Sequence, residues 1–398
     1  MFSLKSKLEP NLRIAMENNY YKHYKVLIHC KHMCDKIHNV LMSHNNSVIR
    51  YIPTIQCISA LVTSQVIEKL LEYPQIDFIT FDNYAILCGS SVLAANGIHF
   101  QSRYKLTGKD ITIGIVDSGL YPHSDILNPE NRIKKFTDLI NEYQYPYDDN
   151  GHGTFISGLI CGSGYSSKGM YKGIAEKSNI YMIKAFNQTG KGYISDILFS
   201  IELLLNHAED YNIRVICLPF EIIHNDYFIL NLFSKLFDIA ISKNIVVVVP
   251  SGNNGPSPGS IRGISILKNC ITVGGVDTRS SSISACSFSS SGPFAKLDKP
   301  DLCAASEEIC SIKSDTYYIS EKNGRKIYPN HLETPYTNFS GTSCSAAYIA
   351  GLCALLLEKN SSLTFSDIVS ILKVSCKLQK FSKWNQGAGT VDLSKCLL

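Results

Sequence analysis

The segment "ITIGIVDSG" (residues 111–119) decides the fold, because an apolar strand ends there at a carboxylate that a turn follows. Nearly every side chain before Asp117 is apolar. The same composition recurs later in the chain, at 179–186, 213–220, 244–250 and 270–276. Strands with so few polar side chains are typical of sheets that are buried on both faces.

Helical segments separate these strands. Residues 195–206 and 233–243 have the length and apolar content of helices that cover a sheet. Strands that alternate with crossover helices are typical of a parallel sheet. We therefore predict an α/β fold with a doubly wound parallel sheet over residues 111–398.

The first part of the chain has a different pattern. Its strand candidates lie at 24–30, at 49–62 with an interruption at Pro53, and at 76–82, and apolar residues recur at helical spacing between them. This mixture predicts a small α+β domain at 24–88, preceded by an N-terminal extension at 1–23. Residues 89–110 mix Gly and Ser with both polar and apolar residues, which is typical of a linker.

Composition and charge argue against several classes of protein. The 398 residues carry a formal net charge of +4 without a basic stripe, so we expect no nucleic-acid partner. No apolar run reaches the ~18 residues of a membrane span and no signal peptide is evident, so we expect a cytoplasmic protein without membrane contact. The fourteen cysteines are scattered, which favours free thiols. We expect Cys30 and Cys34 to pack in a core and the protein to use no metal or other cofactor.

Four polar residues follow strands or open helices. They are Asp117, His152 in "YDDNGHGTFISG" (147–158), Asn253 in "PSGNNG" (250–255) and Ser343 in "NFSGTSCSAAYIAG" (338–351). Each has a structural interpretation when taken alone: a turn former, a structural histidine, a left-handed loop residue and a tightly packed helix residue.

Together these residues supply the groups that nucleophilic catalysis by a serine requires. A serine hydroxyl needs a base, and a neutral imidazole suits that task near pH 7. The imidazole needs a carboxylate to fix its tautomer, and a tetrahedral oxyanion needs donors such as the Asn253 amide and the Ser343 backbone N–H.

The order Asp, His, Ser and the blocks "IVDSGLYPHSD", "DDNGHGT", "PSGNNG" and "SGTSCSAA" resemble the subtilase family of serine proteases. The resemblance covers residues 93–398 and is strongest to the intracellular, AprX-type branch. It implies a subtilisin-like serine endopeptidase with Asp117, His152 and Ser343 as the triad and Asn253 in the oxyanion hole. The substrate-binding residues that it implies are Leu218, Pro219, Phe220, Glu221 and Gly252.

The resemblance also implies partners. These are protein or peptide substrates and the chain's own propeptide, since many subtilases carry an α+β propeptide that assists folding and blocks the cleft. The domain at 24–88 takes that place, and we expect self-cleavage in or near 85–93.

The chain departs from the family pattern at 219–222, where Pro-Phe-Glu-Ile replaces Ser-Leu-Gly-Gly. Glu221 is expected to narrow the cleft and to favour basic substrate side chains. Arg262 is a second candidate for shaping specificity, but a solvent-facing arginine explains it equally. If this change spoils the cleft, the chain is instead a catalytically impaired pseudoprotease that binds or regulates other proteins. An α/β-hydrolase esterase is disfavoured, because it would need a G-x-S-x-G elbow and a different order of residues.

Two further positions carry hypotheses. Cys344 stands where subtilisins usually have Met, and we expect it to be a packing residue whose thiol could confer sensitivity to thiol reagents. Asp125 matches a position that can bind calcium in the family, but a polar turn residue explains it equally, so no metal ligand is predicted.

Overall fold

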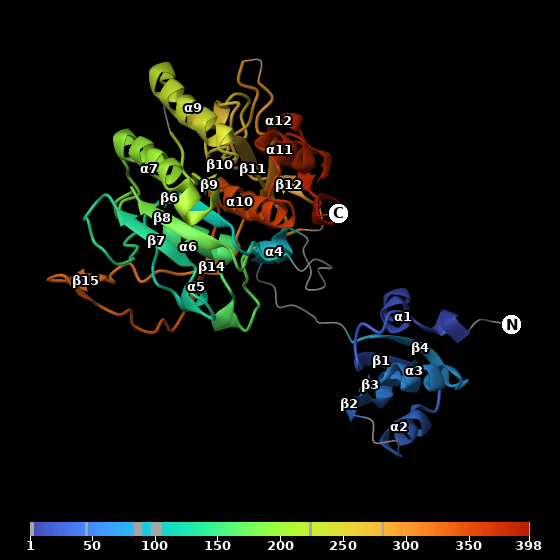
Figure 1. Ribbon diagram of the computed structural model, residues 1–398. Helices are drawn as coiled ribbons and strands as arrows, with labels where there is room; N and C mark the ends of the chain where they lie inside the picture. Colours follow the sequence, from blue (N-terminus) through green and yellow to red (C-terminus); the bar gives the residue numbers. More distant parts are fainter. Residues whose placement is uncertain are drawn as a thin grey trace. The chain divides into compact units, whose positions relative to one another are not determined.

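The protein, a computed structural model, forms two compact units, Met1–Cys88 and Gly89–Leu398, and each has its own hydrophobic core (Figure 1). The residues that the structure describes are 4–43, 47–82, 90–96, 106–222, 225–280, 282–295 and 297–397. Residues 85–89 of the expected cleavage segment, and residues 89 and 97–105 of the expected linker, therefore lie outside the described residues.

The N-terminal unit is a four-stranded antiparallel sheet in the order β2-β3-β1-β4, with helices in the connections. Its elements are β1 Tyr24–Cys30, α2 Cys34–Ser43, β2 Ser47–Ile52, β3 Cys57–Val62, α3 Ser64–Leu71 and β4 Ile76–Phe81. The strand material at 49–62 is interrupted at Pro53, as expected, because Pro53 opens a 3-10 turn (Pro53–Ile55) and Gln56 adopts a left-handed φ of 52°.

Part of the expected extension at 1–23 is built into this unit. Residues 10–17 form helix α1 (Pro10–Glu17), and Leu12 on it is fully buried in the same core as Ile28. Cys30 and Cys34 lie in this core as well, and burial, followed by the nearby Cys34 thiol, raises the pKa of Cys30 to about 12. Both side chains are thus part of the packing of the N-terminal unit.

The C-terminal unit is built on a ten-stranded sheet, whose main path runs β18-β19-β13-β11-β10-β9-β6-β8-β7 while β12 pairs with β11. The pairs from β7 through β13 to β19 are parallel, which confirms the predicted α/β sheet. Its strands are β6 Thr112–Asp117, β7 Ile133–Asp138, β8 Asn179–Lys184, β9 Ile213–Cys217, β10 Val246–Pro250, β11 Ile271–Asp277, β12 Ser284–Ala285, β13 Leu302–Ala305, β18 Cys376–Lys377 and β19 Thr390–Val391.

Strand β7 was not predicted from the sequence. It lies at one end of the sheet, where Lys134 and Lys135 are exposed. An edge strand of this kind needs no continuous apolar run, so it lacks the signal by which the central strands were recognised.

Helices cover both faces of this sheet (Figure 1). The helices of this unit are α4 Val92–Ala95, α5 Ser124–Leu127, α6 His152–Cys161, α7 Ile194–Asn206, α8 Ala208–Tyr211, α9 Tyr227–Ser242, α10 Thr342–Lys359, α11 Phe365–Val374, α12 Lys383–Gln386 and α13 Leu393–Cys396. Adjacent residues of a strand point to opposite faces of the sheet and so pack in different cores. Ile115 packs with α6 and α10, whereas Val116 packs with α7 and α9.

Helix α10 is buried along almost its whole length, which explains its run of small and apolar residues. Gly351 is required for close packing, because a Cβ at this position would come within 2.0 Å of the Ile174 side chain. Helix α9 begins six residues before the predicted start at 233, because the Asp226 side chain caps its first turn by accepting from the N–H groups of Phe228 and Ile229.

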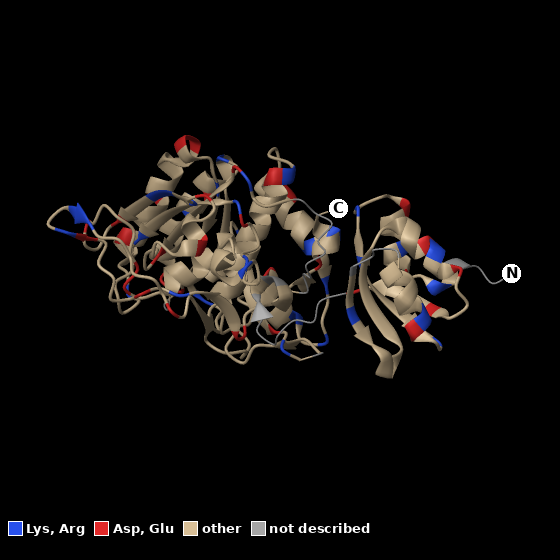
Figure 2. Ribbon diagram, turned by 90° about the horizontal axis from the view of Figure 1, so that it is seen from below, with Lys and Arg blue, Asp and Glu red and all other residues tan. Residues whose placement is uncertain are grey.

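A smaller sheet of β5 (Ser90–Ser91), β14 (Ile309–Ile312) and β17 (Tyr336–Phe339) leads into α10, and β15 (Glu321–Lys322) pairs with β16 (Arg325–Lys326). Acidic and basic positions are interspersed over both units (Figure 2). Among the described residues, the helices are all too short or too polar to cross a lipid bilayer.

Candidate active site

Three elements bring the predicted polar residues together. Asp117 is the last residue of β6, His152 is the first residue of α6 and Ser343 is the second residue of α10. Because β6 lies in the middle of a parallel sheet and both helices pack against the same face, these ends meet at the carboxyl edge of the sheet.

The His152 ring lies between the other two side chains. Its Nδ1 is 2.9 Å from both carboxylate oxygens of Asp117, and its Nε2 is 3.1 Å from Ser343 Oγ. Both distances are within hydrogen-bond range. The imidazole can therefore accept the Ser343 proton while Asp117 fixes the tautomer that carries the proton on Nδ1.

The surroundings of His152 raise its pKa above the ordinary value of 6.5. Burial is the largest single effect and by itself lowers the pKa, but the charge and hydrogen bond of Asp117 and the charge of Asp148 outweigh it. The imidazolium form is therefore stabilised, which suits a base that must hold a proton during a reaction.

Asp148 organises the start of α6. Its carboxylate is buried and accepts hydrogen bonds from the N–H groups of Gly151 (2.8 Å) and Thr154 (2.8 Å). The same carboxylate accepts from Ser118 Oγ at 2.9 Å, and thus joins the segment after Asp117 to the helix that begins with His152. Asp148 was not singled out in the sequence, although it stands in the quoted block before His152.

Asn253 lies on the loop after β10. Its Oδ1 accepts hydrogen bonds from the backbone N–H and the Oγ1 of Thr342, both at 3.0 Å. This arrangement brings the Asn253 amide to the N-terminus of α10, next to Ser343, and leaves Nδ2 as the donor end of the side chain.

Glu221 does not extend freely into the cleft. Its Oε2 accepts from the N–H of Asn253 at 3.0 Å, and its Oε1 contacts Asn254 Nδ2 and lies 3.5 Å from Arg262 Nε. The carboxylate thus braces the loop of Asn253, and its charge is balanced by Arg262. This arrangement argues against the expected attraction for basic substrate side chains.

The other predicted substrate-binding residues differ in position. Pro219 and Phe220 line the cleft with Glu221, and the Phe220 ring packs on Phe186 at a centroid distance of 5.1 Å. Leu218 is fully buried in the core under α7 and α9, so only its backbone is near this edge. Gly252 has a φ of 100° and lies so close to Glu221 that a Cβ would be 3.1 Å from its carboxyl carbon.

The cleft beside His152 has a volume of about 620 Å³. Its lining includes residues that were not predicted from the sequence: Lys313, Ser314, Thr316, Thr337, Asn338 and Phe339. The Phe339 ring packs edge to face on the His152 ring, with 5.8 Å between the ring centroids. Most of these residues lie outside the quoted blocks, so only the three-dimensional structure could assign them to the cleft.

The Asp125 carboxylate has partners from three other residues of the chain. Its buried carboxylate accepts from Tyr336 Oη at 2.6 Å and from the N–H of Ser166 at 2.9 Å, and one oxygen lies 3.6 Å from His123 Nδ1. In the part of the chain that the structure describes, no group of three or more His, Cys, Asp or Glu side chains is arranged to hold a metal ion.

Comparison with known proteins supports one family. The model described as "Subtilase family" matches residues 108–390. Serine protease AprX of Bacillus subtilis (strain 168) is 33% identical over 355 residues, which cover 85% of this chain and 78% of that protein. The chain belongs to the subtilase family. It is a subtilisin-like serine endopeptidase, as the sequence motifs predicted.

Solved structures agree with the fold of this subtilase. Sphericase matches with a TM-score of 0.64 at 20% identity, over 78% of this chain and 100% of that chain. A Staphylococcus aureus serine protease that processes the epidermin leader peptide matches with a TM-score of 0.59 at 17% identity, over 95% of this chain and 99% of that chain.

Cys344 of this subtilase is predicted to be inert. Its side chain is fully buried beside Ser343, and burial raises its pKa from 9.0 to about 12, which lowers the thiolate fraction near pH 7 by roughly 1000-fold. We expect iodoacetamide at pH 7.5 to leave Cys344 unlabelled in the folded enzyme and to label it in urea, as measured by peptide mass spectrometry. Labelling of the folded enzyme at Cys344 with loss of activity would contradict this.

Proposed function

We propose that Asp117, His152 and Ser343 form the catalytic triad of this endopeptidase. The observation that carries the proposal is the position of the His152 ring, within 2.9 Å of Asp117 and 3.1 Å of Ser343. Ser343 Oγ attacks the carbonyl carbon of the scissile peptide bond while its proton moves to His152 Nε2. His152 then gives this proton to the leaving amine, and the acyl group stays on Ser343.

Water completes the reaction. His152 removes a proton from a water molecule that attacks the acyl carbon, and the proton returns to Ser343 Oγ as the acid product leaves. Asp117 stays ionised throughout and stabilises the imidazolium that forms in each half of the reaction.

The oxyanion has two proposed donors. One is Asn253 Nδ2, whose orientation is supported by the two hydrogen bonds that its Oδ1 accepts from Thr342. The other is the backbone N–H of Ser343, which lies in the first turn of α10, where N–H groups point out of the helix.

We propose further that the N-terminal unit is the propeptide of this enzyme and that the chain cleaves itself in or near 85–93. The support is that Met1–Cys88 forms a compact unit with its own core, joined to the unit that carries the site. A cytoplasmic location is proposed from the cysteines, because the thirteen in the described residues are free and a reducing compartment would keep them so.

Replacement of Ser343 tests the triad and the processing together. We expect a fluorophosphonate probe to label the wild-type enzyme, and we expect Ser343→Ala to lose labelling and at least ~1000-fold of its peptidase activity. N-terminal sequencing should give a chain cut near 85–93 for wild type and an intact chain for Ser343→Ala.

The matched control is Ser345→Ala, because Ser345 lies on the same helix and bonds only the Thr342 carbonyl at 2.7 Å among its described contacts. It should retain labelling. A wild-type enzyme that folds but neither reacts with the probe nor cleaves peptides would favour the pseudoprotease.

The pH dependence follows from the raised pKa of His152. Only the neutral ring can accept the Ser343 proton, so kcat/KM should rise with pH through a value above 6.5. The rate of fluorophosphonate labelling should have the same acid limb, because it depends on the same base. An acid limb that falls at or below pH 6 in both measurements would be inconsistent with the contacts of His152.

Glu221 is predicted to act on catalysis more than on specificity. Glu221→Ala removes the acceptor that holds the Asn253 N–H. Removal of an oxyanion donor costs ~100-fold or more in kcat, and because Asn253 is displaced but not removed here, kcat should fall by about 10-fold. The ratio of kcat/KM between peptides with Arg and with Leu before the cleaved bond should stay unchanged. A selective loss for the Arg peptide would restore the hypothesis of basic specificity.

A further inference from the structure

Lys184 is the only charged residue of β8, and its side chain has an exposed fraction of 0%. Its Nζ donates to the carbonyl oxygens of Ser118 (2.5 Å) and Phe186 (3.1 Å) and to Asp149 Oδ1 (2.6 Å). The ammonium also lies 4.9 Å from the centre of the Tyr147 ring. A buried ion pair is often no more stabilising than a packed apolar side chain, so fold stability alone does not account for this lysine.

The first contact of Lys184 reaches Asp117 through Ser118. Lys184 is the pairing partner of Asp117 across β6 and β8, and its ammonium holds the carbonyl of the next residue, Ser118. The N–H of Ser118 donates to Asp117 Oδ1 at 2.6 Å. The peptide segment that orients the Asp117 carboxylate is thus fixed by Lys184.

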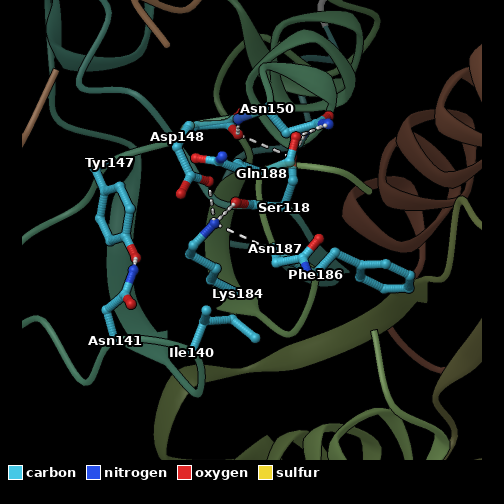
Figure 3. Close-up of polar contacts among 12 residues, drawn as sticks. Ser118, Ile140, Asn141, Tyr147, Asp148, Asn150, Lys184, Phe186, Asn187 and Gln188 are labelled. Atoms are coloured by element: carbon cyan, nitrogen blue, oxygen red, sulfur yellow. Dashed lines mark hydrogen bonds and ion pairs between the residues drawn. The ribbon is translucent and has the colours of Figure 1, made fainter. Parts of the chain in front are cut away.

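The second contact reaches His152 through the loop that precedes α6. Asp149 lies in that loop, next to Asp148, and Figure 3 shows the Lys184 side chain directed toward Ser118 from the strand below this loop. Ser118 Oγ accepts from the N–H of Gly153 at 2.9 Å. Lys184 therefore holds both segments whose relative position sets the distance from Asp117 to His152.

We propose that Lys184 is a positioning residue for the pair Asp117 and His152, and that it acts by joining the Ser118 carbonyl to Asp149. This inference rests on the proposed triad. It predicts that the lysine matters for geometry and for the electric field at His152, whereas an ordinary buried ion pair would matter for stability alone.

The chain offers a matched control. Lys299 is equally enclosed, with an exposed side-chain fraction of 5%, and its Nζ is 2.6 Å from Asp301 Oδ2. It lies in the segment just before β13, outside the strand that ends at Asp117 and the helix that begins at His152. Lys299→Met removes a buried lysine from a carboxylate without touching the candidate site.

The first measurement is steady-state cleavage of a peptide by Lys184→Met, Asp149→Asn, the double variant and Lys299→Met. We expect kcat to fall by roughly 10- to 100-fold in Lys184→Met and in the double variant, with KM changed by less than about 3-fold, because only the alignment of the reacting groups is lost. Asp149→Asn keeps the lysine on Ser118 and should lose less, and Lys299→Met should keep the wild-type kcat.

The second measurement is the pKa of His152, followed by NMR in a Ser343→Ala background, where no turnover is needed. The charged groups around the ring are Asp117 and Asp148 beside it, Lys313 and Glu221 along the same cleft, and the pair of Lys184 and Asp149. Loss of the lysine charge should raise the pKa by ~0.5, and loss of the Asp149 charge should lower it by a similar amount. The double variant should return near the parent value while its kcat stays low.

Several results would overturn the proposal: shifts of the same sign in both single variants, no shift in either, or an equal loss of kcat in Lys299→Met. If Lys184→Met does not fold, the downward shift in Asp149→Asn is still required. Failure of the proposed triad would appear separately, as peptidase activity that survives in Ser343→Ala, and the NMR titration would still report on Lys184.

Discussion

The parallel pairing of β6 with β8 and β9 is the constraint on which the rest of the site depends. Each of these strands is buried on both faces, so its register is fixed by two cores at once. A slip by one residue would exchange Ile115 and Val116 between those cores. It would also turn Asp117 away from the helix that carries His152. The same packing that stabilises the sheet therefore determines the direction of the Asp117 carboxylate.

Much of this arrangement could be predicted from the sequence, because central parallel strands and catalytic blocks both leave local signals. The strand ending at Asp117, the loop with Asn253 and the helix with Ser343 were found in this way. Contributions that depend on distant segments could not be found. Phe339 reaches the His152 ring from β17, and the edge strand β7 has no apolar run. Lys184 was not predicted as a site residue, because the strand that it ends is otherwise apolar and the whole segment was interpreted as core.

At the departure from the family pattern at 219–222, the contacts of Glu221 differ from those expected from the sequence. In the sequence, Glu221 suggested an acidic wall that would select basic substrates. In the structure it joins the edge after β9 to the loop after β10, and Ile222 and Asn225 continue this contact at Gly263. The segment that lines the cleft is thereby tied to the loop that carries Asn253. Phe220 and Phe339 line the cleft together with Glu221.

The hydrogen bond from the Tyr336 hydroxyl to the buried Asp125 carboxylate has a consequence for how the segment before Ser343 is held. Both partners belong to one chain and are 211 residues apart in the sequence, so this bond joins two distant segments of the C-terminal unit. Tyr336 is the first residue of β17, which is followed by α10, so this phenol ties helix α5 to the segment that precedes Ser343.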